Sequence, residues 1–331
     1  LVALASWMRD TYGSTMIQAL KTVIPVKKKV KQKEKRTLIL LLSQDETEEK
    51  LEFYKKKNQK ARYRLLQALA EEKEIPYEIA IEKLNITPAV IRTMEEQKVL
   101  KTESMLVYRN PIHQESQGRY NIILNPEQQR IVDAIWKDES HMVSMIHGVT
   151  GSGKTEIYME LIARTIAENR QAIVLIPEIA LTYQTVMRFY RRFGDRISII
   201  HSRLSAGEKY DQFQRAENGD IDIMIGPRSA LFTPFPRPGL VIIDEEHESS
   251  YKSETTPRYH ARETAIELAR MESAKVILGS ATPSLEAYYR AKKGEYALYT
   301  LNRRARSSIL PEVSVVDMRE ELKNGTRSII C

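Results

Sequence analysis

Short apolar runs alternate with segments of helical spacing along residues 114–305. The runs, which we interpret as buried strands, cover residues 142–146, 172–176, 197–200, 221–225, 240–243 and 275–278. The helices between them are predicted to begin near Lys154, Ile179, Ser205, His260 and Pro283. Strands that are apolar throughout and alternate with helices indicate a parallel sheet that is covered on both faces. We therefore predict an α/β domain over residues 114–305.

Residues 46–113 carry a different pattern, which predicts a small domain of helices followed by a β-hairpin. A short helix is expected at 77–84, and the next one starts at Thr87-Pro88, with Thr87 as the N-cap and Pro88 in the first turn. The hairpin is expected at 99–107. This order is typical of a winged-helix domain. Such domains bind DNA or protein, and both remain open because a fold does not fix a function.

The start of the chain is predicted to form one helix followed by a linker. Apolar residues recur at helical spacing over residues 1–25, and Pro25 ends the helix. Residues 27–36 hold seven positive charges and one negative charge, and such a block repels itself and stays extended. We interpret 27–45 as a basic linker, with the edge of a strand or a phosphate-contacting patch as alternatives.

The composition indicates a globular and basic protein. Hydrophobic residues make up 42% of the 331 residues, and the net charge is +7 with a pI near 9.2. A positive balance attracts polyanions, of which nucleic acid is the commonest, but it also fits a basic protein without such a partner. The single cysteine, Cys331, excludes an internal disulfide and a four-cysteine zinc site, and it is compatible with a reducing cytosol. No apolar run reaches about 18 residues, so no membrane-spanning helix is predicted.

One segment matches the phosphate-binding loop G-x-x-x-x-G-K-[ST] in full and lies between a predicted strand and a predicted helix. Glycines let successive backbone N–H groups turn toward an anion, and the start of the helix adds a partial positive charge. Lys154 is expected to contact the β- and γ-phosphates of ATP, and the Thr155 hydroxyl to coordinate Mg²⁺. The predicted nucleotide contacts are Gly148, Val149, Thr150, Gly151, Ser152, Gly153, Lys154 and Thr155.

An acidic cluster follows the apolar run 240–243. Ligands of open α/β sheets bind at the carboxyl ends of the strands, where Asp244 is expected. We predict that Asp244 holds Mg²⁺ and that Glu245 orients and polarises the water that attacks the γ-phosphorus. With Lys154, these two acids are the predicted catalytic residues; a solvated acidic loop is the alternative.

Several motifs together resemble the superfamily-two helicases. Asp244-Glu-Glu-His247 resembles a DEAH box with Glu at its third place, and Gly279–Ser284 resembles motif III. Leu124–Gln128 looks like the segment on the adenine side of the nucleotide, which makes Gln128 a predicted ATP contact. Leu175–Thr182 looks like motif Ia. The combination is similar to the bacterial primosomal replication-restart helicases, most densely over 120–330.

The resemblance also implies residues that contact DNA or couple DNA to the ATP site. A loop from Ser250 to Arg262 resembles the aromatic-rich coupling loop of the family, although a packed loop with buried tyrosines is an alternative. We do not interpret His247 and His260 as metal ligands, because no cysteine or third histidine lies at ligand spacing. The implied DNA-binding or coupling residues are Thr182, His201, Ser202, Arg228, Ser229, His247, Tyr251, Lys252, Arg258, Tyr259, His260, Arg262, Ser280 and Thr282.

The resemblance implies a domain plan and a setting. Residues 1–26 would end a domain that binds the 3′ end of DNA, 46–113 would be the winged-helix domain, and 114–305 would be a RecA-like motor lobe. Residues 306–331 would lead to a second lobe and a zinc module; because the chain begins with Leu and includes neither, we interpret it as part of a longer protein. The implied cofactors are ATP and Mg²⁺, with zinc bound elsewhere in the family. The implied partners are forked and single-stranded DNA, primosome proteins and single-strand-binding proteins, in the bacterial cytoplasm at the nucleoid.

The leading hypothesis is an ATP-dependent DNA helicase that moves 3′ to 5′ and restarts stalled replication forks. One alternative is a DEAH-type translocase that moves along duplex DNA without unwinding it. Another is a DNA-binding module that ATP switches without hydrolysis. Without a second lobe the nucleotide site is open on one side, so weak hydrolysis is expected from these residues alone.

Overall fold

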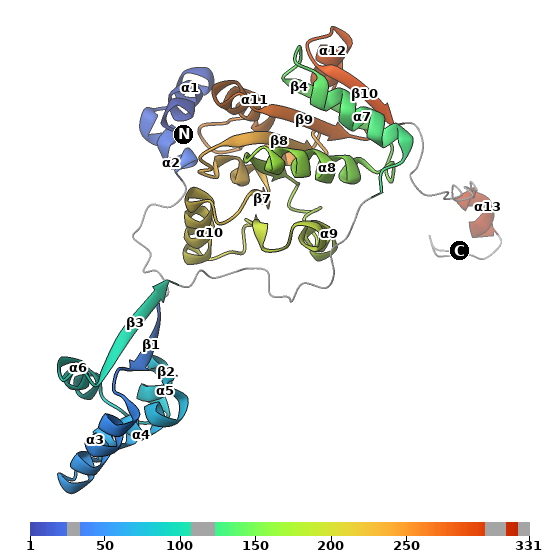
Figure 1. The fold of residues 1–331 in the computed structure, drawn as a ribbon. Helices are drawn as coiled ribbons and strands as arrows, with labels where there is room; N and C mark the ends of the chain where they lie inside the picture. Colours follow the sequence, from blue (N-terminus) through green and yellow to red (C-terminus); the bar gives the residue numbers. More distant parts are fainter. Residues whose placement is uncertain (25–33, 107–122, 302–315, 324–331) are drawn as a thin grey trace.

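The computed structural model describes residues 1–24, 34–106, 123–301 and 316–323 (Figure 1). A large parallel sheet with helices on both faces forms one part, and a small three-stranded domain forms another. A last helix, α13, covers Met318–Lys323. No helix in these ranges has both the length and the apolar character that a membrane span requires.

The large sheet has seven strands in the order β10-β4-β9-β8-β5-β7-β6, and every neighbouring pair is parallel. This arrangement confirms the predicted α/β fold, and six strands coincide with the six apolar runs. The seventh, β10, was not predicted. The strands are β4 (Val143–Gly148), β5 (Gln171–Leu175), β6 (Ile197–Ile199), β7 (Ile223–Gly226), β8 (Pro238–Asp244), β9 (Lys275–Ser280) and β10 (Ala297–Leu301).

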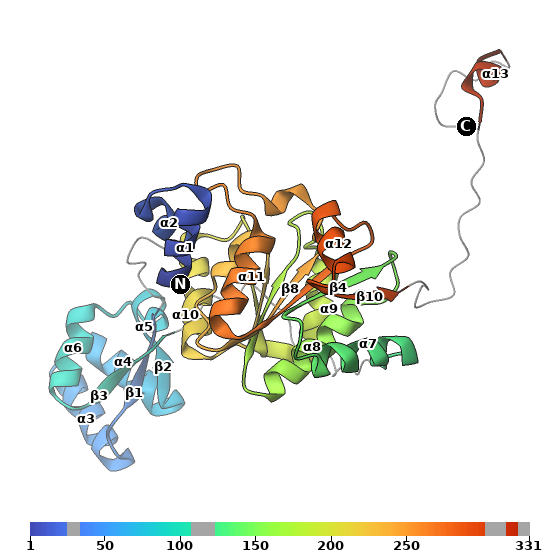
Figure 2. The same ribbon diagram turned by 90° about the horizontal axis from the view of Figure 1, so that it is seen from above.

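Helices cover both faces of this sheet (Figure 2), and a hydrophobic cluster is buried on each face. One face packs against α7, α8 and α9, and the other against α10, α11 and α12. The helices are α7 (Pro126–Lys137), α8 (Lys154–Ala167), α9 (Tyr183–Phe193), α10 (Ala206–Asn218), α11 (Ala261–Glu272) and α12 (Leu285–Lys292), with short 3₁₀ turns η1 (Gly194–Arg196), η2 (Arg228–Phe232) and η3 (Ser249–Tyr251).

Side-chain caps account for where most of these helices begin. Ser205 and His260 cap α10 and α11 as their predicted starts require. Two starts were predicted too early: α9 begins after its cap Thr182 rather than near Ile179, and α12 begins after Ser284. Before α9, the carbonyl of Pro177 accepts hydrogen bonds from residues 180 and 181, so this stretch forms a turn instead of a helix.

The start of the chain is a pair of helices, not the single helix that was predicted. They are α1 (Val2–Tyr12) and α2 (Met16–Val23). Gly13 ends α1 in the left-handed conformation, with φ at 61°, and Thr15 and Gln18 form a capping box that starts α2. Fully buried residues of both helices belong to the same cluster as the sheet and α11, and Figure 1 shows the pair beside α11. Residues 1–24 therefore share the core of the large domain.

The small domain holds a three-stranded antiparallel sheet of order β2-β1-β3 with helices around it. Its core includes Leu38, Leu65, Leu66, Leu69, Ile91 and Met94. The elements are β1 (Glu34–Leu40), α3 (Gln44–Lys56), α4 (Lys60–Glu72), β2 (Glu74–Pro76), α5 (Tyr77–Glu82), α6 (Pro88–Glu96) and β3 (Leu100–Leu106).

Two predictions for this domain were wrong. Residues 34–40 are the central strand of the sheet and not part of a linker over 27–45, because their backbone pairs on both sides. The segment predicted as a hairpin at 99–107 contains one strand, β3, whose partner is the distant β1. Thr87 and Pro88 lie at the N-cap and in the first turn of α6 as predicted, although the Thr87 side chain makes no capping hydrogen bond there. The winged-helix assignment stays a prediction, and residues 27–33 and 107–113 lie outside the described ranges.

Candidate nucleotide-binding site

The predicted phosphate-binding loop connects β4 to α8, as its motif requires. Gly151 and Gly153 have φ angles of 77° and 89°, a left-handed backbone that glycine adopts without strain. The hydroxyl of Ser152 is buried in the loop and has no hydrogen-bond partner among the described residues. This hydroxyl is packed against Gly148, where an added β-carbon would lie 2.7 Å from it.

Lys154 and Gln128 both contact the loop backbone. The Lys154 ammonium is buried and donates to the carbonyl oxygen of Gly148 at 2.7 Å. The Gln128 side-chain amide donates to the carbonyl oxygen of Gly153 at 3.2 Å, while its oxygen accepts from the Asn125 backbone N–H at the start of α7. Gln128 therefore fixes α7 against the phosphate-binding loop.

The strand register brings the acidic box to the same edge of the sheet as this loop. β9 lies between β4 and β8, and Gly279 of β9 is level with Ile146 on one side and Asp244 on the other. The Tyr158 hydroxyl, one turn into α8, donates to the Asp244 carboxylate at 3.0 Å. The Asp244 carboxylate is therefore tied to the helix that begins at Lys154.

Tyr158 was not among the predicted site residues. It reaches Asp244 across Gly279, where a β-carbon would lie 1.6 Å from the tyrosine hydroxyl. Its place four residues after Lys154, on the same face of the helix, was a signal that sequence reasoning could have used.

Burial and the Glu245 carboxylate raise the pKa of Asp244, whereas the hydrogen bond from Tyr158 and the charge of Lys154 lower it. Glu245 has a φ of 47°, which is uncommon for a residue with a β-carbon. The chain thus turns sharply as soon as β8 ends, and the Glu245 side chain stays about one-third exposed. Both acids are partly exposed, and they differ in support: Asp244 accepts the hydrogen bond from Tyr158, whereas Glu245 lies in the sharp turn after β8.

We predict that Asp244→Asn makes the fold more stable at neutral pH. Because the pKa of Asp244 is raised on folding, its favourable contribution is complete below the unfolded pKa and is lost as pH rises through the folded pKa. The asparagine oxygen still accepts from Tyr158, so about 1 kcal/mol of stabilisation is expected at pH 7, and less at pH 4. Urea unfolding at both pH values measures the difference; a less stable variant at pH 7 would contradict the prediction.

Glu246, the third residue of the box, is a buried structural carboxylate. It accepts from the Arg262 guanidinium at 3.0 Å and from the backbone N–H of Ser284 at 2.6 Å. The side chains of Glu246 and Arg262 are 0% and 8% exposed. Glu246 therefore joins the acidic box to the starts of α11 and α12. Arg262, which was predicted to bind or couple DNA, is enclosed in this ion pair and does not face solvent.

His247 connects the box to the motif III segment. Its Nδ1 lies 2.8 Å from the Ser280 hydroxyl, and its Nε2 lies 3.4 Å from that of Thr282. Ser280 is fully buried, and Thr282 is exposed. The three residues form a hydrogen-bonded group that joins the acidic box to the end of β9.

The loop from Tyr251 to Arg262 is packed against the domain. Tyr251 and Tyr259 are 1% and 4% exposed, so in this structure neither ring can stack on a base. The Tyr251 hydroxyl lies 2.7 Å from the carbonyl oxygen of Asp244, to which it donates, and Tyr259 packs edge-on against Phe232. The Arg228 guanidinium donates to the carbonyl oxygens of Ser250 and Lys252. The packed alternative therefore holds for both tyrosines, and the coupling role of the loop stays a prediction.

Other residues that were predicted to meet DNA lie at or near the surface. Lys252 and Arg258 are exposed on the loop, Thr182 is the exposed cap of α9, and His201 and Ser229 are half-buried. The Ser202 hydroxyl and the Ser202 backbone N–H both donate to the Glu178 carboxylate, which lowers the pKa of Glu178.

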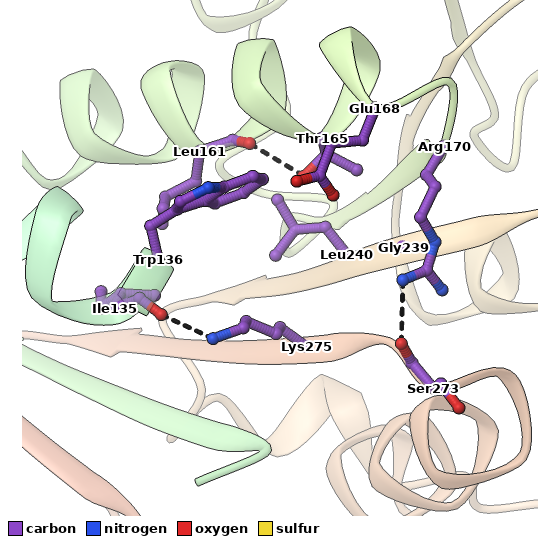
Figure 3. Close-up of a pocket in the computed structure, with 10 residues that line it drawn as sticks. All are labelled: Ile135, Trp136, Leu161, Thr165, Glu168, Arg170, Gly239, Leu240, Ser273 and Lys275. Carbon is purple, nitrogen blue, oxygen red and sulfur yellow. Dashed lines mark hydrogen bonds between the residues drawn. The ribbon is translucent and has the colours of Figure 1, made fainter. Parts of the chain in front are cut away.

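A separate cavity of about 150 Å³ lies at the amino-terminal ends of β8 and β9, on the opposite edge of the sheet from the acidic box (Figure 3). Trp136 and Leu240 line it, and its cations are bound to backbone carbonyls. Lys275 donates to Ile135 at 2.6 Å, and Arg170 donates to Ser273 at 2.9 Å. The cavity shares no residue with the candidate site.

A family model for DEAD/DEAH box helicases matches residues 125–291, which include the phosphate-binding loop and the acidic box. The chain belongs to the DEAD/DEAH box helicase family. It is similar to replication restart protein PriA: that of Bacillus subtilis (strain 168) is 46% identical over 261 residues, which cover 77% of this chain and 32% of that protein. PriA of Synechocystis sp. is 41% identical over 236 residues, which cover 70% of this chain and 28% of that protein.

The chain thus spans about a third of the length of the curated relatives it matches. Among solved structures, RecG bound to a three-way DNA junction matches 57% of this chain and 25% of that chain, at 22% identity and a TM-score of 0.43.

Proposed function

We propose that residues 148–155 and the acidic box bind and hydrolyse ATP. The observation that carries this proposal is the Tyr158–Asp244 hydrogen bond, since it ties the acid to the helix that starts at the phosphate-binding loop. The loop N–H groups and the Lys154 ammonium would neutralise the β- and γ-phosphates. To do so, Lys154 would exchange the Gly148 carbonyl for phosphate oxygens.

The proposed hydrolysis needs no covalent intermediate, only positioning and charge neutralisation. The Thr155 hydroxyl and the Asp244 carboxylate are the donors that would hold Mg²⁺, which supplies positive charge next to the phosphates. Glu245, which is partly exposed just beyond Asp244, would orient the attacking water and accept its proton. Asp244, which is held by Tyr158, and Glu245, which lies in the turn just beyond it, suit these two roles.

We further propose that the full-length protein is a DNA helicase that restarts replication at stalled or forked structures. The support is the similarity to PriA, whose name describes replication restart, together with a net charge of +7. Movement from 3′ to 5′, zinc in another module, primosome and single-strand-binding proteins as partners, and a cytoplasmic location belong to the same proposal.

An ATPase assay of the full-length protein tests this proposal. Forked and single-stranded DNA should stimulate hydrolysis and the strands should separate. Stimulation by duplex DNA only, without unwinding, would indicate a translocase instead, and nucleotide binding without hydrolysis would indicate a switch.

DNA binding should weaken steeply as salt increases. Phosphate contacts release counterions, so affinity for a forked DNA should fall at least about tenfold between 50 and 200 mM salt. Fluorescence anisotropy of a labelled fork measures the change. An affinity that does not depend on salt would argue against DNA as the partner.

A further inference from the structure

The loop between η3 and α11 has a narrow neck. Lys252 and His260 form an isolated antiparallel bridge there, and the next residue, Ser253, donates its backbone N–H to the carbonyl oxygen of Tyr259 at 2.8 Å. Beyond the neck, residues 254–256 and Arg258 are exposed. The loop therefore has a solvent-facing tip and a closed base.

Both sides of the neck lead directly to the acidic box. Next to Lys252, Tyr251 is hydrogen-bonded to the backbone of Asp244. Two residues after His260, Arg262 is paired with the buried Glu246. These contacts lie only one or two residues away from the neck along the chain. A shift of the neck would therefore move Tyr251, which is bonded to the Asp244 backbone, and Arg262, which is paired with Glu246.

One side chain from the start of the sequence contacts both residues of the neck. The Tyr12 hydroxyl accepts from the His260 backbone N–H at 3.4 Å, and the Lys252 ammonium lies 5.6 Å from the centre of the Tyr12 ring. Tyr12 is the last residue of α1, more than 230 positions away in sequence from either partner.

Tyr12 itself is held in a fixed position. The Trp7 ring packs edge-on against it at 5.7 Å between ring centres. On the same helix, Leu4, Ala5 and Met8 are fully buried in the cluster that includes the sheet and α11. Through Tyr12, the packed helix α1 therefore contacts both residues of the neck.

We propose that Tyr12 is a positioning residue, through which the α1–α2 pair holds the neck of loop 252–260 and so sets the geometry of the acidic box. The part of this proposal that concerns hydrolysis rests on the proposed ATPase function. The part that concerns the neck rests only on the contacts above.

Hydrogen exchange of the 331-residue chain tests the neck. Tyr12→Phe keeps the ring and removes the acceptor, so the His260 amide should exchange about threefold faster, the effect of losing one weak hydrogen bond. Tyr12→Ala also removes the ring that the Lys252 ammonium contacts, so amide exchange should become faster at both His260 and Ser253. Tyr289→Phe, at an exposed tyrosine whose ring contact is with Lys293, is the matched control and should change neither amide. Unchanged exchange at His260 in both Tyr12 variants would overturn the proposal.

ATP hydrolysis by the full-length protein tests the consequence for the box. Tyr12→Ala should lower DNA-stimulated kcat about fivefold while KM for ATP stays unchanged, because the contacts of Tyr12 are with Trp7, Lys252 and His260, none of which belongs to the phosphate-binding loop. Faster exchange with normal stimulated kcat would overturn the link to the box. If the wild-type protein hydrolyses no ATP yet its Tyr12 variants exchange faster, the proposed function fails while the role of Tyr12 at the neck stands.

Discussion

Lys154→Ala is expected to lower ATP hydrolysis at least about a hundredfold and to leave DNA affinity within about twofold of wild type. Lys154 is the buried cation of the phosphate-binding loop, and its ammonium is within 2.7 Å of the Gly148 carbonyl oxygen. Alanine removes that charge where the transition state gains negative charge, but it leaves the surface of the domain unchanged. Steady-state ATPase rates and fork binding, measured side by side, give the two values.

Lys137→Ala is the matched control for this experiment. Lys137 is exposed in the last turn of α7, and its removal subtracts the same charge from the domain without touching the loop. Hydrolysis by the control should equal that of wild type. If Lys154→Ala hydrolyses ATP at the wild-type rate, residues 148–155 do not bind the phosphates of ATP, whatever the control shows.

Glu246→Ala is expected to destabilise the fold by about 3 kcal/mol, because removing one partner of a buried ion pair leaves the other charge uncompensated. Arg262 would lose its partner at 3.0 Å, and the Ser284 backbone N–H would lose an acceptor at 2.6 Å. Arg262 keeps Glu263 as a second partner, which places the expected loss at the low end of the range for such pairs. Urea denaturation measures the free energy of unfolding.

Glu52→Ala provides the surface comparison. Glu52 pairs with Lys56 at 3.3 Å, but both side chains are more than 70% exposed. Removing such a pair should cost less than about 0.5 kcal/mol. Equal losses in the two variants would mean that Glu246 does not hold the starts of α11 and α12.

The sequence predicted most of the large sheet because six of its seven strands are buried on both faces and are therefore mainly apolar. β10 escaped because it mixes half-buried and exposed residues and lies at the edge of the sheet. The single helix predicted at 1–25 failed because the apolar spacing continues through Gly13, where the backbone turns left-handed. The strand at 34–40 was not predicted because it begins with three charged residues. Its pairing partners, β2 and β3, lie more than 30 residues away in sequence.

Sequence reasoning located site residues best where the chemistry requires particular residue types within one short segment. The phosphate-binding loop and Asp244 meet at one edge of the sheet as predicted. The supporting residues were missed because their partners lie far away in sequence: Tyr158 acts on Asp244, and Tyr12 contacts His260. The burial of Tyr251 and Tyr259 depends on contacts with distant parts of the domain. The sequence around them is mostly polar and does not show those contacts.

The fit of Tyr158 over Gly279 makes these two positions interdependent. Any side chain at 279 would occupy the space of the tyrosine hydroxyl, so the hydrogen bond to Asp244 would be lost even though 279 has no chemistry of its own. A descendant of this protein could enlarge residue 279 only after shortening residue 158. A shorter residue at 158 would remove the hydrogen bond to Asp244. A substitution at Gly279 or at Tyr158 is therefore unfavourable by itself, and the two positions are expected to change together.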